Sequence, residues 1–174
     1  MDTLEAISHQ RVVRAFQERT LPDDVVATIL DAGRRTGSSK NQQRWAFITV
    51  TDRATLGRLA TVGPWCGHIA GAATAIALVT PDPRASGAPL SVMWDLGRAA
   101  QNMTLAAWAL GVGSCPGTVY EQAACREILG YPEDRHCEFI LSLGYPEDPA
   151  DLTRPLKAGG RHELSSMVHA ERWG

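Results

Sequence analysis

The stretch SVMWDLGRAAQNMTLAAWAL, residues 91–110, decides much of the fold that the sequence predicts. It is long enough for about five helical turns, and it is apolar on nearly every face. Small residues recur along it, at Gly97, Ala99, Ala100, Ala106, Ala107 and Ala109. A helix that is apolar on most faces is buried on several sides. We therefore expect it to be the central helix of the domain or to be covered by a second subunit.

Helices and strands alternate along the rest of the chain. Pro22 and the acidic pair Asp23 and Asp24 favour a helix over 20–37 that ends at Gly37. Further helices are predicted at 3–8, 52–60 and 120–129, and apolar runs predict strands at 44–50, 72–80 and 137–143. The run at 72–80 suits a strand buried on both faces, and RVVRAF at 11–16 suits an extended segment. This order predicts an α+β domain with about four strands.

Length and composition argue against several classes of protein. The chain has 174 residues and a formal net charge of −2, so we expect one domain and no general nucleic-acid surface. No apolar run reaches the roughly 18–20 residues that cross a bilayer. The first residues, MDTLEAISHQR, lack the apolar core of a signal peptide. We expect a cytoplasmic protein with no membrane partner.

No arrangement of side chains indicates metal or acid–base chemistry. The cysteines Cys66, Cys115, Cys125 and Cys137 form no C-x-x-C pair, and the five histidines show no metal-ligand spacing. Free, buried thiols are the expectation. The G-x-S-x-G elbow, the P-loop and the dinucleotide-binding glycine motif after a strand are all missing. We predict no metal and no catalytic side chain, so a cofactor would supply the chemistry of any enzyme.

A polar stretch, GSSKNQQ at 37–43, precedes the predicted strand at 44–50. Ser38, Ser39, Asn41 and Gln43 offer hydrogen-bond donors and acceptors that suit a ribityl chain or the edge of a heterocycle. The alternative is that these residues cap the preceding helix and form a turn. Residue chemistry alone leaves both interpretations open.

Two pairs of basic residues are candidate anion sites. Arg11 and Arg14 lie in the segment 11–16, whose apolar residues should hold it on the core, and their guanidinium groups could clamp a phosphate. Arg161 and His162 follow a flexible pair of glycines, which also suits a phosphate. The alternative for either pair is solvated surface charge.

Four segments of the chain resemble the FMN-dependent nitroreductase family. AISHQRVVRAF is similar to its N-terminal RRSxRxF signature, and GSSKNQQRWAFITV to its SSxNxQPWxFxVV segment. DLGRAAQNMTLAAWALGVGSC resembles its long central helix, which ends in GLGSC. GRHELSSMVHAERWG resembles its C-terminal RKPLxxxVHxxRW. The four matches occur in the order of the family and span nearly the whole chain, which is as short as the minimal members.

The resemblance implies an α+β, three-layer sandwich in which helices flank a central mixed, mostly antiparallel sheet. It implies a single nitroreductase-like domain over 1–174 and a homodimer that binds FMN at its interface. The C-terminal extension 146–174 would be exchanged between subunits and dock on the partner. Apolar residues in this extension agree with such docking; they are Leu164, Met167, Val168 and Trp173.

When the family's FMN contacts are carried over residue by residue, the resemblance implies which residues of this chain contact FMN. Arg11, Val12 and Arg14 fall on the segment that binds the phosphate and ribityl groups. The polar-loop positions, which contact FMN from the other subunit, are Ser38, Ser39, Asn41 and Gln43. The positions on a loop beside the isoalloxazine ring are Gly113, Pro116 and Gly117. The C-terminal phosphate-binding positions are Arg161 and His162.

The chain departs from the family pattern at several of these places. Gln10 replaces an Arg, Val12 replaces a Ser, and Arg44 stands where Pro is usual. His162 stands where Lys is usual. Together these changes remove cationic contacts and one hydroxyl, which would weaken FMN binding or indicate a different ligand. Pro116 also lacks an N–H, so a backbone hydrogen bond to the flavin would come from Gly117 or a neighbour.

The resemblance implies a flavin oxidoreductase with NADH or NADPH as the hydride donor. Hydride would pass through flavin N5 to a small organic electron acceptor of the nitroaromatic or quinone type. Two alternatives stay open because of the departures. One is a non-catalytic protein that binds or sequesters flavin, and the other is a specialised dehydrogenase or deazaflavin-dependent branch of the fold.

Overall fold

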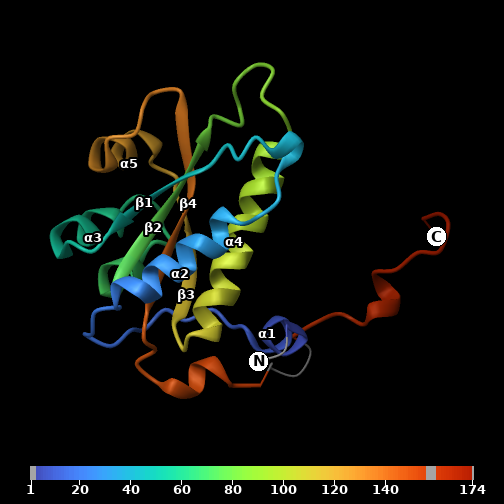
Figure 1. The fold of residues 1–174 in the computed structure, drawn as a ribbon, viewed down its shortest axis with the longest axis horizontal. Coiled ribbons are helices and arrows are strands. Elements are labelled where there is room, and N and C mark those ends of the chain that lie inside the picture. The colour runs from blue at the N-terminus through green and yellow to red at the C-terminus, as the bar shows by residue number, and fades with distance from the viewer. Residues whose placement is uncertain (1–2, 156–159, 174) are drawn as a thin grey trace.

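The computed structural model describes residues 3–155 and 160–173, which form an α+β domain. The helices are α1 (Thr3–His9), α2 (Asp23–Arg34), α3 (Arg53–Leu59), α4 (Ser91–Ala109) and α5 (Gln122–Leu129) (Figure 1). The strands are β1 (Ala46–Val50), β2 (Thr74–Pro81), β3 (Gly113–Thr118) and β4 (Arg135–Gly144). Each helix predicted from the sequence is present. Among the described residues, no helix combines the length and the apolarity needed to cross a membrane.

The four strands form one antiparallel sheet in the order β1-β2-β4-β3. In the centre of the sheet, Ile76 of β2 lies opposite Leu141 of β4. An isolated parallel bridge joins Val12 to Ser114 of β3. The expected central sheet, mixed but mostly antiparallel, is therefore confirmed.

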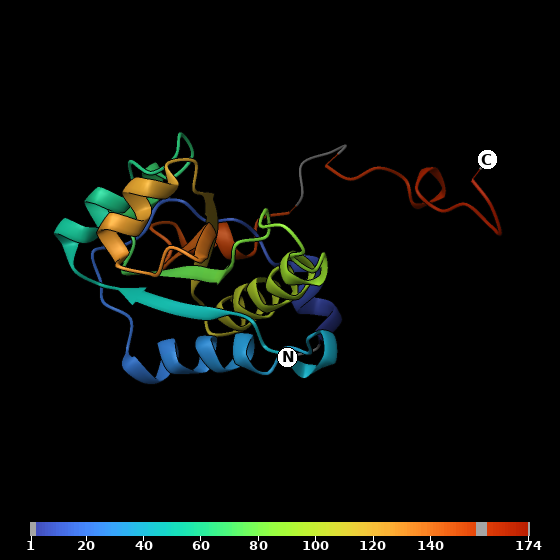
Figure 2. The same ribbon diagram turned by 90° about the horizontal axis from the view of Figure 1, so that it is seen from above.

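The sheet is the middle one of three layers (Figure 2). Helices α2 and α4 cover one face, and α3 and α5 cover the other. Strand β2 is buried on both faces because its successive residues point into different layers. Ala75, Ala77 and Val79 pack with α3 and α5, whereas Ile76 and Leu78 pack with α2 and α4, and each is at most 3% exposed. The strand predicted from the apolar run at 72–80 matches this central position.

Helix α4 is buried along one side and exposed along another. Leu96, Met103 and Ala107 belong to the core between α2 and the sheet. The contact with α2 is close, because a Cβ at Gly33 would collide with the Met103 side chain. On the other side, Trp94 is 69% exposed. Within one chain α4 is therefore the central helix, and its exposed side leaves room for the second subunit that the sequence suggests.

Strand β3 corrects one expectation. The resemblance implies a loop at 113–117, but these residues form a strand in which Gly113 lies opposite Gly144 and Gly117 opposite Ile140. Glycine and proline are poor strand formers by their own preference. They are accepted here because β3 lies at an edge of the sheet, where a proline such as Pro116 is tolerated. Pairing with β4 thus overrides the local preference.

The segment 11–16 is extended, as predicted, but it makes isolated bridges rather than a regular strand. Val12 bridges Ser114, and Val13 is buried at 1% exposure. Val13 packs on Gly113, where a Cβ would lie 2.7 Å from Val13 Cβ. Val12 itself is 45% exposed. Val13 rather than Val12 therefore holds the segment on the core.

The C-terminal extension 146–174 divides into two parts among its described residues. The first part packs on its own chain, where Trp108 Nε1 donates a hydrogen bond to Leu152 O at 2.9 Å. The second part, 160–173, extends away from the domain (Figures 1 and 2). Residues 156–159 and 174 lie outside the described part of the chain. The resemblance implies docking of the whole extension on a partner. This docking stays a prediction, and it now concerns only the second part.

We predict that Gly113→Ala destabilises the protein whereas Gly57→Ala does not. The methyl group added at Gly113 would collide with Val13, and overpacking of this kind costs about 1–3 kcal/mol of unfolding free energy. A Cβ at Gly57 in α3 meets nothing within 4 Å, and alanine is favoured over glycine in a helix by roughly 0.5–1 kcal/mol. Urea denaturation measures both effects. Equal stability of the two variants would contradict the close packing of Val13 on β3.

Candidate functional site

Strand β3 and the segment 11–16 form the first half of the candidate site. The bridge between Val12 and Ser114 aligns the segment with β3. Arg11 is half-buried and donates to two backbone carbonyls of the preceding turn at 2.8 Å, whereas its Nε is buried without a partner. Arg14 is exposed and lies next to β3. The structure therefore brings Val12 and Arg14 to the strand that contains Gly113, Pro116 and Gly117. The contacts of these residues and of Arg11 with FMN stay predictions.

Arg14 borders a hollow of about 410 Å³ at the edge of β3. The residues that line this hollow are Arg14, Pro64, Trp65, Gly67, His68 and Pro116. Trp65 is 72% exposed, which leaves much of its indole ring uncovered. The hollow thus combines a cation with flat apolar surfaces, an arrangement that can bind a planar ligand carrying negative charge.

His68 is held by a hydrogen bond to Ser142 in this hollow. Its Nδ1 lies 2.7 Å from Ser142 Oγ, and Ser142 donates its hydroxyl hydrogen to Cys115 O at 3.2 Å. This contact ties the Nδ1 side of the ring to Ser142, and the buried Nε2 has no hydrogen-bond partner among the described residues. Burial lowers the pKa of the imidazole, and the positive charge of Arg14 lowers it further. His68 is thus predominantly neutral at pH 7.

All four cysteines are free and buried, as predicted. Burial raises the pKa of the Cys66 thiol to about 11. Burial also raises the pKa of Cys115, although the charge and hydrogen bond of Arg14 act in the opposite direction. Both thiols stay protonated near neutral pH, so neither is a reactive thiolate beside the hollow.

The polar loop, residues 38–43, forms the second half of the candidate site. Ser38 Oγ accepts a hydrogen bond from Gln43 N at 2.9 Å, and Gln43 Nε2 donates to Asn41 Oδ1 at 3.1 Å. Lys40, Asn41 and Gln43 all have positive φ values, of 52°, 53° and 46°. Residues other than glycine seldom adopt this conformation, and such strain concentrates at functional sites. Left-handed residues occur in turns as well as in binding loops, so the strain alone leaves both interpretations open.

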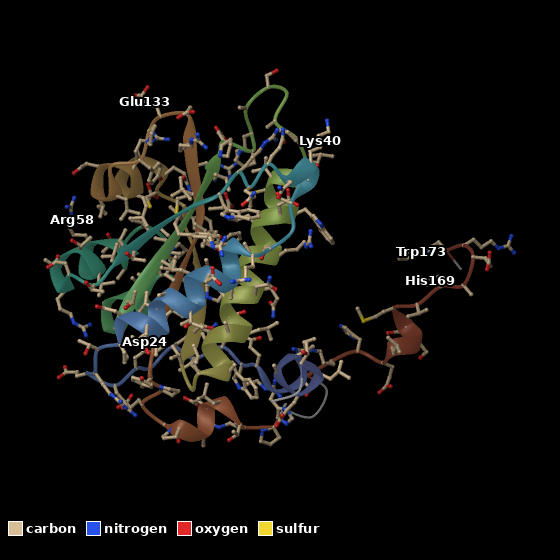
Figure 3. The ribbon with its side chains drawn as sticks, viewed as in Figure 1. Asp24, Lys40, Arg58, Glu133, His169 and Trp173 are labelled. Atoms are coloured by element: carbon tan, nitrogen blue, oxygen red, sulfur yellow. The ribbon has the colours of Figure 1, made fainter. Side chains whose placement is uncertain are left out.

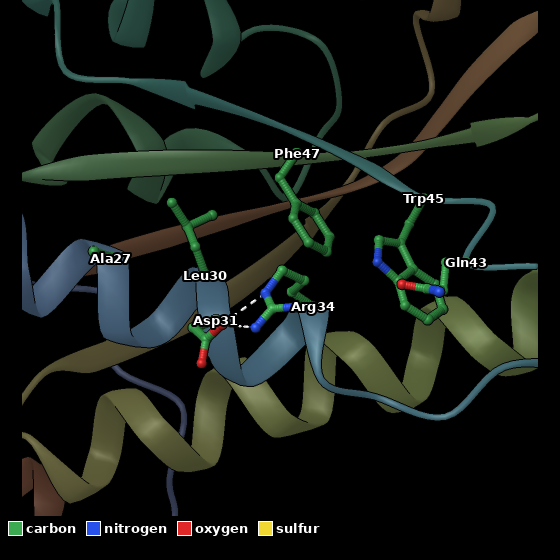
Figure 4. A pocket seen from close by; sticks show the side chains of 7 residues that line it. All are labelled: Ala27, Leu30, Asp31, Arg34, Gln43, Trp45 and Phe47. Carbon is green, nitrogen blue, oxygen red and sulfur yellow. Dashed lines mark hydrogen bonds and ion pairs between the residues drawn. The ribbon is translucent and has the colours of Figure 1, made fainter. Parts of the chain in front are cut away.

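Gln43 also borders a second hollow, of about 570 Å³, between α2 and β1 (Figure 4). Trp45 and Phe47 line this hollow from the β1 side. Asp31 and Arg34 line it from α2 and form an ion pair at 2.6 Å. Because Arg34 is engaged by Asp31 there, this hollow offers less free positive charge than the hollow beside Arg14.

The two halves lie at opposite ends of α4 within one chain. Ser39 N donates to Asp95 Oδ2 at 2.9 Å near the start of α4, whereas Gly113 begins β3 just beyond its end. From Asp95 to Ala109 the helix rises about 21 Å. Figures 1 and 3 show the separation, with Lys40 at one end of α4 and β3 near the other. A single chain therefore does not bring the polar loop to Arg14.

Three other residues singled out in the sequence lie outside the hollow beside Arg14. Arg161 and His162 are exposed on the part of the extension at 160–173. Arg44, which departs from the family pattern, lines a hollow of about 660 Å³ beside Tyr131. Within one chain, none of the three supplies positive charge to the hollow beside Arg14.

Sequence reasoning missed Trp65 and His68. Both lie in the connection between α3 and β2, where neither spacing nor a motif marks them. His68 contacts Ser142, which is 74 residues away in the chain. The approach of this connection to β3 is a tertiary contact, so the sequence carried no local signal for it.

Comparisons with known proteins identify the family of this fold and site. A sequence model of the Nitroreductase family matches residues 7–66 and 63–145. A relative from Archaeoglobus fulgidus, provisionally named an NADH dehydrogenase/NAD(P)H nitroreductase, is 34% identical over 178 residues, which are 99% of each chain. The chain belongs to the nitroreductase family, and the expectation of an oxidoreductase is confirmed.

Further relatives share the architecture. A Vibrio harveyi protein named NADPH-flavin oxidoreductase is 29% identical over 90% of this chain and 71% of its own. A crystal structure from Parabacteroides distasonis, provisionally named like the Archaeoglobus relative, has a TM-score of 0.85 at 26% identity and covers 98% of both chains. The structure of the Vibrio harveyi NADPH:FMN oxidoreductase complexed with NAD+ has a TM-score of 0.81 at 24% identity, covering 99% of this chain and 78% of that one. These likenesses confirm the predicted α+β fold.

We predict that Arg14→Ala raises the pKa of His68. The guanidinium charge disfavours the imidazolium form, so its removal makes protonation easier. The measurement is an NMR titration of the His68 ring protons. Arg35→Ala is the matched control, because Arg35 is exposed on α2 and pairs with Asp31. An unchanged His68 pKa in Arg14→Ala would contradict the placement of the Arg14 side chain.

Proposed function

We propose that this protein is an FMN-dependent oxidoreductase that takes hydride from NADH or NADPH and reduces a small organic acceptor of the nitroaromatic or quinone type. The observation that carries the proposal is the hollow at β3, where Arg14 lies beside Trp65 and Pro116. A cation next to flat apolar surfaces suits a ligand with both a phosphate and a planar ring. The names of the relatives, which include a flavin oxidoreductase, support the same cofactor.

The groups around the hollow fit FMN. His68 Nε2 borders the hollow and is buried without a hydrogen-bond partner, as is Arg11 Nε in the adjoining segment outside the hollow, and such groups are costly unless a ligand or solvent satisfies them. Arg11 and Arg14 offer positive charge along one strand edge, where a phosphate would bind. When bound, FMN supplies a ring that accepts a hydride and passes it on, which is chemistry that amino-acid side chains do not provide.

The chain's own residues would bind and orient rather than react. Arg11 and Arg14 would hold the phosphate through charge-assisted hydrogen bonds. The Trp65 ring would cover one side of the hollow and exclude water from it. His68, locked by Ser142 and neutral, adds no second positive charge beside Arg14. No acid–base pair is needed in this scheme, which agrees with the sequence.

The proposed site needs two subunits. Because α4 separates the polar loop from Arg14, the loop would reach the hollow of a second copy of the chain. The exposed Trp94 of α4, at 69%, and the neighbouring Leu90, at 97%, support an interface there. Exposed apolar residues on the extension would be buried by docking on the partner; they are Leu164, Met167, Val168 and Trp173. Arg161 and His162 would then approach the phosphate from this extension.

A second candidate function is flavin binding without turnover. Val12 is 45% exposed at the phosphate segment and offers no hydroxyl there, and Gln10 replaces a cation. A specialised dehydrogenase or a deazaflavin-dependent enzyme would use the same hollow with a different ligand. Spectroscopy of the purified protein separates these candidates.

We predict that the purified protein binds FMN and that NADH or NADPH bleaches the bound flavin. Absorbance in the flavin bands is recorded anaerobically before and after addition of each nucleotide, and then after addition of a quinone, which should restore the colour. Bound flavin that neither nucleotide bleaches would favour the second candidate or the specialised branch. A protein that cannot be loaded with FMN would overturn the proposed function.

We predict that Arg14→Ala weakens FMN binding by roughly 10-fold to 100-fold. A hydrogen bond to a charged group contributes about 1.5–3 kcal/mol, and each 1.4 kcal/mol corresponds to about tenfold in affinity. Quenching of FMN fluorescence measures the dissociation constant. Arg35→Ala removes an equal charge from the exposed end of α2 and should leave the affinity unchanged. Equal losses in the two variants would undo the assignment of Arg14 to the phosphate.

A further inference from the structure

Asp95 is a buried carboxylate in the second turn of α4, at 8% exposure. Its Oδ2 accepts a hydrogen bond from Ser39 N at 2.9 Å, across 56 residues of sequence. A buried carboxylate is costly without partners, and hydrogen bonds to charged acceptors are among the strong ones in proteins. Asp95 lies far from Arg14 in its own chain, so the residues of the first half of the site do not explain why this carboxylate is buried.

Two further residues of α4 contact the chain that leads into the polar loop. Arg98 lies over Gly37, where a Cβ would be 3.2 Å from Arg98 Nη2. Asn102 Nδ2 donates to Thr36 Oγ1 at 2.7 Å. With Asp95 these residues are spaced i, i+3 and i+7, which places them along one side of the helix. Helix α4 thus lies against the chain at Thr36 and Gly37, before the loop, and Asp95 makes the contact at Ser39 in the loop itself.

The polar loop needs such an anchor because its backbone is strained. Three of its residues, Lys40, Asn41 and Gln43, have positive φ values, a conformation that persists when surrounding contacts over-determine it. The side chains of all three are exposed, so the loop buries little of its own surface. Its internal hydrogen bond from Gln43 N to Ser38 Oγ closes the loop but does not attach it to the domain.

We propose that Asp95 is a positioning residue for the binding site. By holding Ser39 N, it keeps the polar loop in the left-handed conformation that presents the hydrogen-bonding groups of Ser39, Asn41 and Gln43 to a flavin bound by the second subunit. The ligand in this statement rests on the proposed function. The anchoring of the loop does not, and it can be measured without flavin.

Three variants test the proposal. Asp95→Ala removes the acceptor of the hydrogen bond, whereas Asp95→Asn keeps the shape of the side chain and one acceptor oxygen. Glu127→Ala is the matched control, because it removes a carboxylate with 79% exposure that pairs with Arg58, on the side of the molecule away from Lys40 (Figure 3). Thermal unfolding is recorded for each variant. Asp95→Asn keeps the test decisive if the alanine variant fails to fold.

The first readout is the rate of trypsin cleavage after Lys40, followed by mass spectrometry without flavin. Local opening controls proteolysis of folded proteins, so we expect cleavage at least about tenfold faster in Asp95→Ala. Asp95→Asn should lie between Asp95→Ala and the unaltered protein, and Glu127→Ala should cleave at the unaltered rate. An unaltered rate in Asp95→Ala, or in Asp95→Asn if the alanine variant does not fold, would overturn the proposal.

The second readout is the dissociation constant for FMN. Loss of one charge-assisted hydrogen bond corresponds to about tenfold or more in affinity when a binding loop depends on it. We expect that loss in Asp95→Ala and partial rescue in Asp95→Asn. Faster cleavage with unchanged FMN affinity would overturn the positioning role, because Asp95 would then serve stability alone. If the unaltered protein binds no FMN, the proposed function fails, and the cleavage rates still decide whether Asp95 holds the loop.

Discussion

The packing of α4 between α2 and the sheet is the contact on which both halves of the site depend. Leu96, Met103 and Ala107 bury one side of the helix in the core. With that side fixed, the start of α4 carries Asp95 to the polar loop, and its end delivers the chain into β3. The length of the helix then keeps the two halves apart in one chain. A shared flavin site between two copies follows from this separation if the loop is a binding loop.

The hollow beside β3 shows how neighbouring groups control one another's charge. Arg14 supplies positive charge, and it lowers the pKa of His68, which burial already lowers. His68 is tied to Ser142, whose hydroxyl is in turn tied to the backbone of Cys115. The result is one exposed cation with a neutral ring behind it. That arrangement suits an anionic ligand without placing two cations in contact.

Much of the fold could be predicted because hydrophobic patterns are local. The apolar run at 72–80 led to the central strand β2, and the small, apolar residues of 91–110 led to a helix that is central or covered by a second subunit. The structure places this helix, α4, in the core along one side and leaves another side exposed. Strand β3 could not be predicted in the same way. Its sequence, GSCPGT, has the glycine and proline of a loop, and it becomes a strand because β4 offers a complete edge for pairing.

The candidate site could be predicted only where its residues lie in motifs that are local in the sequence. Arg14 and Pro116 carried recognisable motifs, and the structure brings them together. Trp65 and His68 carried no motif, because their place in the hollow depends on how the connection between α3 and β2 folds against β3. The side chains of Arg161 and His162 remain exposed on the extension, so the structure of one chain does not bring them to the hollow.

By itself, the sequence determined the helices, three of the four strands, the family and the residue types that the resemblance assigns to FMN contacts, because periodicity and motifs are encoded along the chain. The tertiary structure alone decided that 113–117 is an edge strand, that His68 is a neutral neighbour of Arg14, and that Asp95 fastens the polar loop. Each of these depends on contacts between residues far apart in the chain. Such contacts form when burial of the core brings distant segments together, and no local pattern records them.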